Sequence, residues 1–556
     1  MADPRDELVF APLGGIGEIG MNLGLYGLGM PRRKTWLAVD FGVSFAGDEL
    51  PGVDLIMPDI AYLVEQRKNL VGIVLTHAHE DHFGALFDLW PRLGVPVYAT
   101  PFTAALIEAK RESEPGLPQI DIRVVQLGSR FKVGPFDIEL VTVAHSIPES
   151  NALIIRTPYG TVLHTGDWKI DPTPLINQPT DEAKLRALGD EGCLAMIGDS
   201  TNAVREGRSP SEAEVEKTLI ELIHGAPARV AVTTFASNIA RIKAVADAAR
   251  ACEREVVIIG RAMERLVQVA RETGYLDGVQ EFRHVDAYGY LPPDKVLAIC
   301  TGSQGEPRAA LARIAADDHP EVTLSRGDRV IFSSRTIPGN EKAVARVING
   351  LVAQGIDVIT DRTHLVHVSG HPRAGEVADM YSWVRPRIAV PVHGEQLHLG
   401  EHAKLARAAG VSEVIKCQNG DVIRLGPDSP GKVDEIAAGR LYKDGRLIVP
   451  AAATAIADRR KMSFVGVISI AITLDPKGEI IDGPEFEMVG IPERNAEGAM
   501  IENLVAEAIL DALDSLPRAR RRDPGSVAEA MRRAVRSAVA QHWGKKPLCL
   551  VHVMAG

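Results

Sequence analysis

Residues 71–84, VGIVLTHAHEDHFG, decide how the rest of the chain is interpreted. The first part of this stretch is apolar and rich in β-branched residues, which is typical of a buried strand. The ligand-type side chains that follow within six positions are His77, His79, Asp81 and His82. A loop at the end of a buried strand holds its side chains in fixed places, as metal ligands require. The stretch therefore predicts a metal site, and a solvated histidine-rich loop is the alternative.

The spacing of the motif suggests two metal positions. His77 and His79 are two residues apart and point the same way while the chain is extended. Asp81 and His82 follow where a helix would begin, so they can face a second position. Imidazole and carboxylate groups without thiolates suit zinc or manganese in a hydrolytic centre better than a structural zinc site.

Further polar side chains come at the ends of later apolar runs. His145 closes FDIELVTVAH, Asp167 closes TVLHTGD and His393 closes RIAVPVH. Together with the first motif they provide enough ligands for two metal ions. Two ions bridged by Asp167 can lower the pKa of a bound water and hold a phosphate in line for hydrolysis.

Composition and charge place few limits on function. A chain of 556 residues suggests about three domains. The net charge of −11 argues weakly against a nucleic-acid partner, but basic residues gather near the C-terminus. A solvated helix face explains this cluster as well as a phosphate-binding surface does. Its members are Arg518, Arg520, Arg521, Arg522, Arg532, Arg533, Arg536, Lys545 and Lys546.

The sequence predicts a cytoplasmic protein without a membrane partner. The N-terminus has no charged-then-apolar signal pattern, and the longest apolar run, residues 465–474, is about half of a membrane span. The five cysteines lie far apart, mostly in apolar runs, so we interpret them as reduced core residues.

Residues 15–20, GIGEIG, match a dinucleotide-binding fingerprint, and Asp40 follows at a suitable distance. The context argues against that interpretation, because a short strand follows the glycines where a helix should begin. Two strands joined through residues 31–34 instead predict the opening hairpin of a sheet.

The alternation of strands and helices predicts the domain organisation. Strands with flanking helices in residues 1–203 and 366–427 indicate a two-sheet sandwich that is covered by helices. Residues 204–365 contain continuous apolar strands and helices at 239–251, 263–273 and 341–353, which predicts an inserted parallel α/β domain. Residues 428–463 are interpreted as a linker. Residues 464–556 form a small α/β domain, with helices near 496–513 and 526–543, that suits dimerisation.

Glycine and serine at strand-to-helix turns expose backbone amides to which an anion can bind. Residues 301–307, TGSQGEP, form such a turn, and Ser303 is its candidate phosphate contact; a tight connection without a ligand is the alternative.

The order of HAHEDH, DSTN, FASN, TGSQGEP, HVSGH and PVHGE resembles the ribonuclease J family, in the β-CASP group of the metallo-β-lactamase superfamily. This resemblance implies a metallo-β-lactamase αββα sandwich with an inserted parallel α/β (β-CASP) domain and a small C-terminal α/β domain. The sequence departs from the family pattern at Ala262, where a serine is usual.

The resemblance also implies an activity. It implies a zinc-dependent ribonuclease with endonuclease and 5′→3′ exonuclease activity that favours 5′-monophosphate ends, in rRNA processing and mRNA decay. The implied cofactors are two Zn²⁺ per subunit, with Mn²⁺ or Mg²⁺ as substitutes, and one Ca²⁺. The implied partners are RNA, copies of the chain in a homodimer or homotetramer, and members of an RNA-decay complex.

Site residues carry over from the family motifs. Asp199 and His371 match an acid/base pair, and the zinc ligands match His77, His79, Asp81, His82, His145, Asp167 and His393. The segment that holds substrate phosphate matches His367, Val368, Ser369, Gly370 and His371. A calcium site falls on the carbonyls of Pro51 and Val53 with the side chain of Asp444. For His371 the alternative is a buried histidine that stabilises a domain junction. His164 is interpreted as a core residue, and its alternative is a supporting role behind the metal ligands.

Two other functions are compatible with a metal site of this kind. A hydrolase of small esters or thioesters would not need so large an inserted domain. A catalytically silent RNA-binding subunit would have lost at least one ligand, whereas this chain has the full set.

Overall fold

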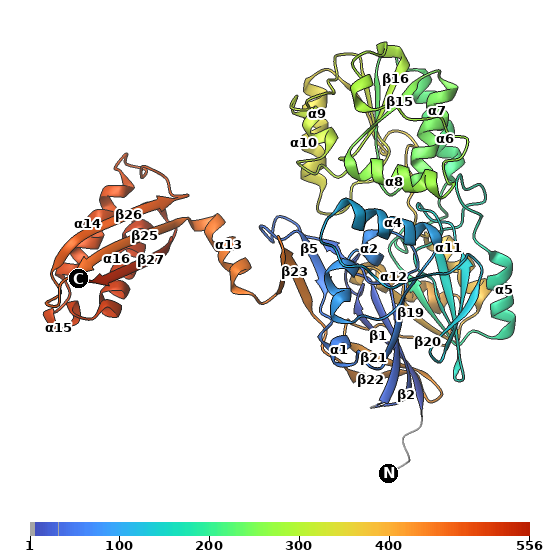
Figure 1. Cartoon of the computed structure of the whole chain (residues 1–556), viewed down its shortest axis with the longest axis horizontal. Coiled ribbons are helices and arrows are strands. Elements are labelled where there is room, and N and C mark those ends of the chain that lie inside the picture. Colours follow the sequence, from blue (N-terminus) through green and yellow to red (C-terminus); the bar gives the residue numbers. More distant parts are fainter. Residues whose placement is uncertain (1–5, 32) are drawn as a thin grey trace. The chain divides into compact units, whose positions relative to one another are not determined.

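The computed structural model describes residues 6–31 and 33–556. It contains two compact units (Figure 1). The first comprises Met1–Phe45 and Leu55–Leu441, and the second comprises Ala46–Asp54 and Tyr442–Gly556.

Two large sheets form the core of the first unit. The eight-stranded sheet has the order β22-β21-β1-β2-β3-β6-β7-β8, and the seven-stranded sheet has the order β20-β19-β13-β12-β11-β10-β9. Side chains from both sheets meet in one apolar cluster, which includes Phe10 and Val74 from the first and Ile155 and Ile197 from the second. This confirms the two-sheet sandwich.

The bounds of the first sheet are β1 Glu7–Gly14, β2 Leu23–Met30, β3 Arg33–Val39, β6 Leu70–Val74, β7 Val97–Ala99, β8 Ile122–Val124, β21 Asp421–Gly426 and β22 Gly431–Glu435. Those of the second are β9 Arg130–Val133, β10 Phe136–Thr142, β11 Asn151–Thr157, β12 Gly160–His164, β13 Ala195–Asp199, β19 Ile388–Val392 and β20 Glu413–Val414. β2 and β3 pair in antiparallel register, as the predicted hairpin requires.

Helices cover the outer face of the second sheet. Leu185 of α5, Tyr381 of α11 and Ala406 of α12 pack with Ile154 and Met196 in a second apolar cluster. The helices of this part are α1 Ala61–Glu65, α2 Glu80–Phe83, α3 Leu86–Leu89, α4 Pro101–Ser113, α5 Glu182–Glu191, α11 Ala374–Val384 and α12 Gln396–Ala408. The short strands β4 Ser44–Phe45 and β5 Leu55–Pro58 pair in antiparallel register.

The sequence after the metal-ligand motif predicts one helix near residues 84–93, but the structure interrupts it, so this prediction is wrong in detail. Its place is taken by α2, α3 and a 3₁₀ turn at Trp90–Arg92. The N–H of Ala85 donates to the carbonyl of Phe41 (3.0 Å) instead of continuing the helix. This bond ties the segment after the metal-ligand motif to the segment that follows β3.

The inserted domain is a five-stranded sheet of order β15-β16-β14-β17-β18, and all of its neighbouring pairs are parallel. Helices flank this sheet (Figure 1). Two helices have the expected bounds, α7 Ile239–Ala251 and α10 Glu341–Ala353, whereas α8 Arg261–Glu272 begins earlier than expected. The other elements are α6 Glu212–His224, α9 Ala310–Ala315, β14 Val230–Thr233, β15 Glu255–Ile259, β16 Val296–Cys300, β17 Arg329–Phe332, β18 Asp357–Ile359 and 3₁₀ turns at Val285–Ala287 and Pro293–Lys295.

The stretch 428–463 contains more structure than a linker. Besides β22 it contains β23 Arg440–Asp444, β24 Leu447–Pro450 and most of α13 Thr454–Val465. In the second unit, α14 Ile501–Asp514 and α16 Pro524–Trp543 pack on a sheet of order β26-β25-β27. The remaining bounds are β25 Val467–Leu474, β26 Ile480–Val489, α15 Arg518–Arg521 and β27 Leu548–Ala555.

Candidate metal centre

The predicted metal-ligand motif lies on the turn between β6 and α2. His77 is fully buried at the end of the strand, and His79 is the N-cap of α2, with extended backbone angles (φ −83°, ψ 146°). Asp81 and His82 lie in the first turn of α2. The two halves of the motif therefore belong to different backbone conformations, as their spacing predicts.

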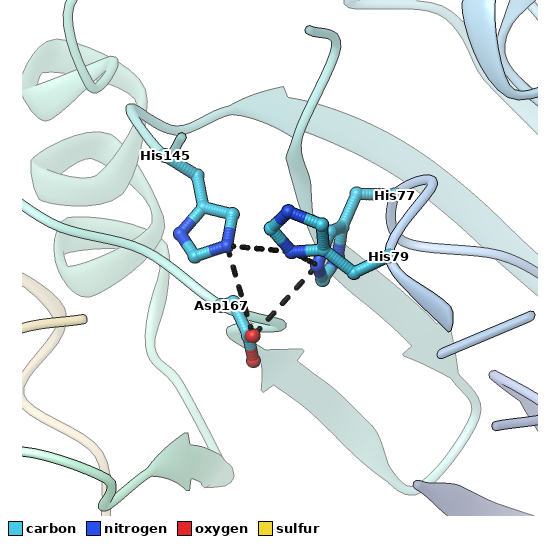
Figure 2. A group of neighbouring side chains, drawn as sticks. All are labelled: His77, His79, His145 and Asp167. Carbon is cyan, nitrogen blue, oxygen red and sulfur yellow. Dashed lines mark hydrogen bonds and ion pairs between the residues drawn. The ribbon is translucent and has the colours of Figure 1, made fainter. Parts of the chain in front are cut away.

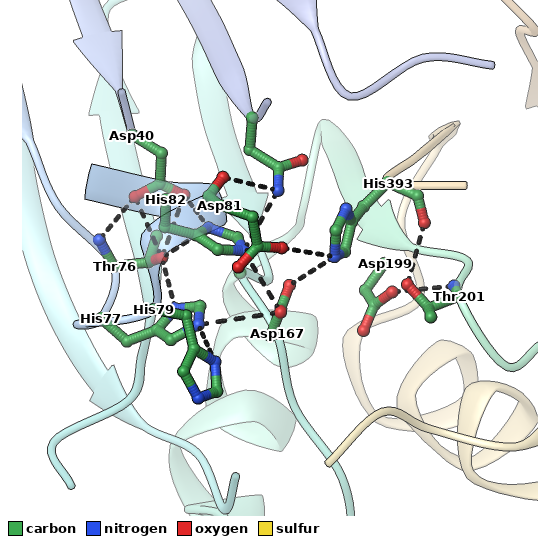
Figure 3. A network of polar contacts seen from close by, with 12 residues as sticks. Asp40, Thr76, His77, His79, Asp81, His82, Asp167, Asp199, Thr201 and His393 are labelled. Carbon is green, nitrogen blue, oxygen red and sulfur yellow. Dashed lines mark hydrogen bonds and ion pairs between the residues drawn. The ribbon is translucent and has the colours of Figure 1, made fainter. Parts of the chain in front are cut away.

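Three other strands bring further ligand types to this turn. His145 follows β10, Asp167 follows β12 and His393 follows β19. The seven side chains form two groups, and within each group the candidate ligand atoms lie within 4.8 Å of one another. One group is His77, His79, His145 and Asp167, and the other is Asp81, His82, Asp167 and His393 (Figures 2 and 3). Asp167 belongs to both.

In the first group, three ring nitrogens converge. His79 Nδ1 lies 3.1 Å from both His77 Nε2 and His145 Nε2. Asp167 Oδ2 lies 3.7 Å from His77 Nε2 and 3.8 Å from His145 Nε2. Ring nitrogens this close need a proton or a cation between them, and this set of nitrogen and oxygen donors is one that zinc accepts.

The second group surrounds Asp81 and Asp167. His82 Nε2 lies 3.2 Å from Asp167 Oδ2 and 3.5 Å from Asp81 Oδ2. His393 Nε2 lies 3.6 Å from Asp81 Oδ2 and 3.5 Å from Asp167 Oδ1. Both ring nitrogens of His393 are buried without a hydrogen-bond partner among the described residues. Because an unsatisfied buried polar group costs about 1–3 kcal/mol, a cation at Nε2 fits this site.

Burial and charge set the protonation states of the ligands. Burial lowers the pKa values of His77 and His79 well below the usual value and that of His145 to about 4, so these rings are neutral. For His82 burial acts in the same direction, but Asp167, Asp81 and Asp40 outweigh it and raise the pKa well above the usual value. The first group thus offers neutral imidazoles, and the carboxylates of the second group provide negative charge that a divalent cation would balance.

Asp40 supports both halves of the motif and was missed as a site residue. Its carboxylate accepts hydrogen bonds from the Thr76 N–H (2.8 Å) and hydroxyl (3.0 Å), and lies 2.7 Å from His82 Nδ1 (Figure 3). A carboxylate behind a metal-ligating histidine fixes its tautomer and orientation. The available signal was an apolar strand, residues 36–39, that ends in an aspartate.

Asp199 and His371 form a pair beside the ligands. Asp199 ends β13, and its Oδ2 lies 2.8 Å from His371 Nδ1. Burial opposes a charge on His371, but Asp199 and Asp167 outweigh it and raise its pKa to about 9. His371 Nδ1 is also 3.7 Å from Asp167 Oδ2. His164, by contrast, lies outside the ligand groups found among the described residues, and its Nδ1 is 2.9 Å from the hydroxyl of Tyr26.

The segment before His371 lies among cationic side chains. Burial and the charges of Arg241, Arg335 and Lys169 keep the pKa of His367 well below its usual value, and its buried Nδ1 has no hydrogen-bond partner in the described chain. Gly370 contacts His145 so closely that a Cβ would lie 2.5 Å from the ring. The rest of the segment is Val368, which is buried, and Ser369, whose hydroxyl accepts from the His371 N–H (3.3 Å).

The other predicted contacts lie elsewhere. Ser303 is 3% exposed. Its neighbour Gln304 donates to the backbone carbonyl of Arg335 (2.9 Å), and this bond joins the turn to one of the cationic residues near His367. The predicted calcium ligand Asp444 lies in the second compact unit, where its Oδ2 is 2.6 Å from Arg459 Nη2.

Two facing sheets with nitrogen and oxygen ligands at their strand ends define a metallo-hydrolase of the metallo-β-lactamase fold. Comparisons with known families agree with this class. Residues 34–189 match the metallo-beta-lactamase superfamily, and residues 355–417 match the Zn-dependent metallo-hydrolase RNA specificity domain. Residues 227–351 match the ribonuclease J beta-CASP domain, and residues 454–556 match the ribonuclease J C-terminal domain.

Curated relatives match over almost the whole chain. Ribonuclease J of Sinorhizobium meliloti is 54% identical, over 99% of this chain and 97% of the relative. Ribonuclease J of Corynebacterium glutamicum is 39% identical, over 99% of this chain and 76% of the relative. The crystal structure of a protein of unknown function from Enterococcus faecalis shares the fold alone, with 17% identity, a TM-score of 0.53 and coverage of 75% of this chain and 100% of that one. The chain belongs to the ribonuclease J family.

The resemblance, the fold class and the metal-dependent ribonuclease activity inferred from sequence are therefore confirmed. The protein is a metal-dependent ribonuclease that uses a divalent metal and binds RNA as its substrate. Within the described residues, no helix is both long and apolar enough to span a bilayer.

Proposed function

We propose that the protein hydrolyses RNA phosphodiester bonds at a centre of two zinc ions, internally and from the 5′ end. The observation that carries this proposal is Asp167, which belongs to both groups of the predicted zinc ligands. His77, His79 and His145 would hold one ion, and Asp81, His82 and His393 the other, with Asp167 common to both. Mn²⁺ or Mg²⁺ are possible substitutes. Bound ions of this kind supply Lewis-acid polarisation of the phosphate and a water of lowered pKa.

The residues of the chain provide the proton chemistry. Asp199 accepts from His371 Nδ1 and favours the charged ring, so at neutral pH His371 carries a proton that it can donate. Donation from its other ring nitrogen to the leaving oxygen or to a developing oxyanion would assist the break of the P–O bond. Asp199 would hold the ring in place during this step.

Cationic side chains beside this pair would hold the RNA backbone. Arg205 and Arg373 lie close enough to lower the pKa of Arg335, after the larger effect of burial. We propose that these arginines, with the segment from His367 to His371, guide the phosphates of the RNA toward the metal ligands. The turn with Ser303 is joined to Arg335, and we propose it as the contact for a 5′-monophosphate.

Cleavage assays with 5′-monophosphorylated and 5′-triphosphorylated RNA, with and without chelator, test this proposal. We expect chelation to abolish cleavage, and His77→Ala and Asp81→Ala to do the same while the fold is kept. Asp199→Asn and His371→Gln should lower kcat by about 10²–10⁴-fold at unchanged zinc content. His284 and Asp286 form an exposed pair, with Nδ1 of the histidine 3.0 Å from Oδ2 of the aspartate. His284→Gln and Asp286→Asn are therefore the matched controls. Full activity in His77→Ala or Asp81→Ala would disprove the assignment.

Replacement of Ser303 with Leu tests the 5′-phosphate contact. The larger side chain would fill the turn, so we expect exonucleolytic decay of monophosphorylated RNA to fall severely and internal cleavage of a long RNA to fall much less. Equal losses in both assays would place the phosphate contact elsewhere.

Other properties follow from the family and remain proposals. We propose a cytoplasmic protein, since all five cysteines are free and RNA is the substrate. We also propose a homodimer or homotetramer that associates with an RNA-decay complex in rRNA processing and mRNA decay.

A further inference from the structure

The predicted calcium site lies within the second compact unit, between the loop Ala46–Asp54 and β23. Its candidate ligands are the carbonyls of Pro51 and Val53 and the carboxylate of Asp444. Calcium takes six to eight oxygen ligands and relies on carboxylates for charge. The fit therefore depends on whether Asp444 is available to a metal.

The carboxylate of Asp444 is already paired with a cation of the chain. Arg459, on α13, places Nη2 2.6 Å from Asp444 Oδ2. The same guanidinium packs against the loop at Gly52. A Cβ on that glycine would lie 2.8 Å from Nη1 and 3.5 Å from Cζ of Arg459. Gly52 has φ +79°, so a side chain there would be strained as well.

The second terminal nitrogen of the guanidinium lies against the loop that carries the two candidate carbonyl ligands. Arg459 Nη1 is buried without a hydrogen-bond partner among the described residues and lies against the turn between Pro51 and Val53. The neighbouring Arg460 donates from Nε to the carbonyl of Glu49 (2.9 Å) in the same loop. The hydrogen bond to Asp444 raises the pKa of Arg459, which thus remains charged at every physiological pH.

A metal at this site would compete with the guanidinium for the carboxylate of Asp444. A calcium ion on Asp444 would lie a few ångströms from a fixed positive charge, and the repulsion would oppose binding. The residues present do not fit calcium while Arg459 is in place.

We propose that the guanidinium of Arg459 takes the place of the calcium ion that the family pattern implies. Nη2 binds the carboxylate of Asp444 on β23, and Nη1 faces the turn at Gly52. The arginine side chain thus performs the structural role of the metal. The link between the loop and β23 is then independent of calcium, and removal of the side chain should expose a calcium site.

Calcium titration of the full-length, zinc-saturated protein tests this inference, with heat of binding and melting temperature as readouts. For the wild type we expect neither calcium uptake nor a shift in Tm. Arg459→Ala should melt about 1–3 °C lower and should regain stability as calcium is added. Arg459→Lys keeps the charge and should remain insensitive to calcium, and Lys461→Ala, at an exposed position of the same helix, is the matched control.

A second substitution identifies the site of any calcium response. Asp444→Asn in the Arg459→Ala background should abolish the response, because it removes the carboxylate. The inference would be overturned if the wild type bound one calcium ion that Asp444→Asn removes. It would also be overturned if Arg459→Ala melted like the wild type without a response to calcium, or if the double variant kept the response.

Discussion

His402 supports the turn that carries Asp199. The ring is buried between two hydroxyl groups, with Nδ1 2.8 Å from Ser200 Oγ and Nε2 2.8 Å from the hydroxyl of Tyr381. Ser200 follows Asp199 directly, and the next hydroxyl, of Thr201, donates to the carbonyl of His393 (3.0 Å). A neutral ring can satisfy both hydroxyl groups, and burial favours the neutral form by lowering the pKa of His402 to about 4.

This pKa makes stability depend on pH in a defined direction. Above pH ~6.5, the pKa of an unfolded histidine, the ring is neutral in both states and contributes nothing. As the pH falls below that value, the ring becomes protonated in the unfolded state but stays neutral in the folded state. The free energy of unfolding therefore decreases, by about 2 kcal/mol at pH 5. Between pH 7.5 and 5, the free energy of unfolding in urea should therefore fall further for the wild type than for His402→Gln. Exposed His224→Gln is the control, and equal losses in wild type and His402→Gln would contradict the prediction.

At the scale of elements, a buried ionic network joins the inserted domain to the metal centre. Arg241 of α7 is fully buried and binds Glu212 of α6 (2.7 Å), whose other oxygen is 3.4 Å from Lys169 Nζ. Lys169 lies two residues after Asp167. Arg241 Nη1 also donates to the carbonyl of Val366 (2.8 Å), directly before the phosphate segment. One side chain thus orders two parts of the proposed site.

Loss of Arg241 should affect both stability and RNA binding. Arg241→Met leaves Glu212 with only part of its charge compensation, and a broken buried pair costs about 3–5 kcal/mol. We expect a lower Tm, an increased KM for RNA and an unchanged zinc content. Arg250→Met, at an exposed position of the same helix, is the control.

The double variant separates structural support from positioning. Arg241→Met with Glu212→Gln removes the uncompensated charge, so Tm should recover in part while KM stays high. Recovery of both together would mean that Arg241 only stabilises the fold.

The elements that sequence predicted best are those with a strong local pattern. α7 and α10 have amphipathic spacing, and the metal strand ends in a dense run of ligands. The interrupted helix after Phe83 depends on the bond from Ala85 to Phe41, a partner more than forty positions away. Asp40 shows the same limit at the site. Its distance from the glycines of residues 15–20 matched a dinucleotide-binding fingerprint, whereas its partners in the structure, Thr76 and His82, lie far away in the sequence.

At the scale of the whole molecule, the helices of the C-terminal unit, as far as the structure describes the chain, pack on one face of its sheet and leave the other face open. Ile468 and Ile470 of β25 face α14 and α16, whereas Ser469 and Ala471 between them point to the opposite side. On that opposite face Leu550 and Met554 of β27 are 45% and 50% exposed. Exposed apolar side chains on an open sheet favour association with a partner.

Two of the nine basic residues near the C-terminus have partners within this unit. Arg521 donates to the carbonyls of Leu516 (2.9 Å) and Asp514 (2.9 Å), and Arg532 pairs with Glu529, one turn earlier in its own helix. These bonds occupy the side chains within the unit. The open sheet face is therefore the better candidate for contact between copies of the chain.

Light scattering tests a role of this face in oligomerisation. Deletion of residues 464–556 should lower the mass toward that of a monomer while zinc content is kept, because the metal ligands lie outside this segment. Leu550→Lys combined with Met554→Lys should have the same effect in the full chain, since two charges on the apolar face would have to be desolvated at an interface. Leu510→Lys, at a 46% exposed position of α14, adds a charge away from the sheet face and should leave the mass unchanged. If the deletion lowered the mass but the double variant did not, the edges of β26 and β27 would carry the contact. An unchanged mass in both would remove the C-terminal unit from the interface.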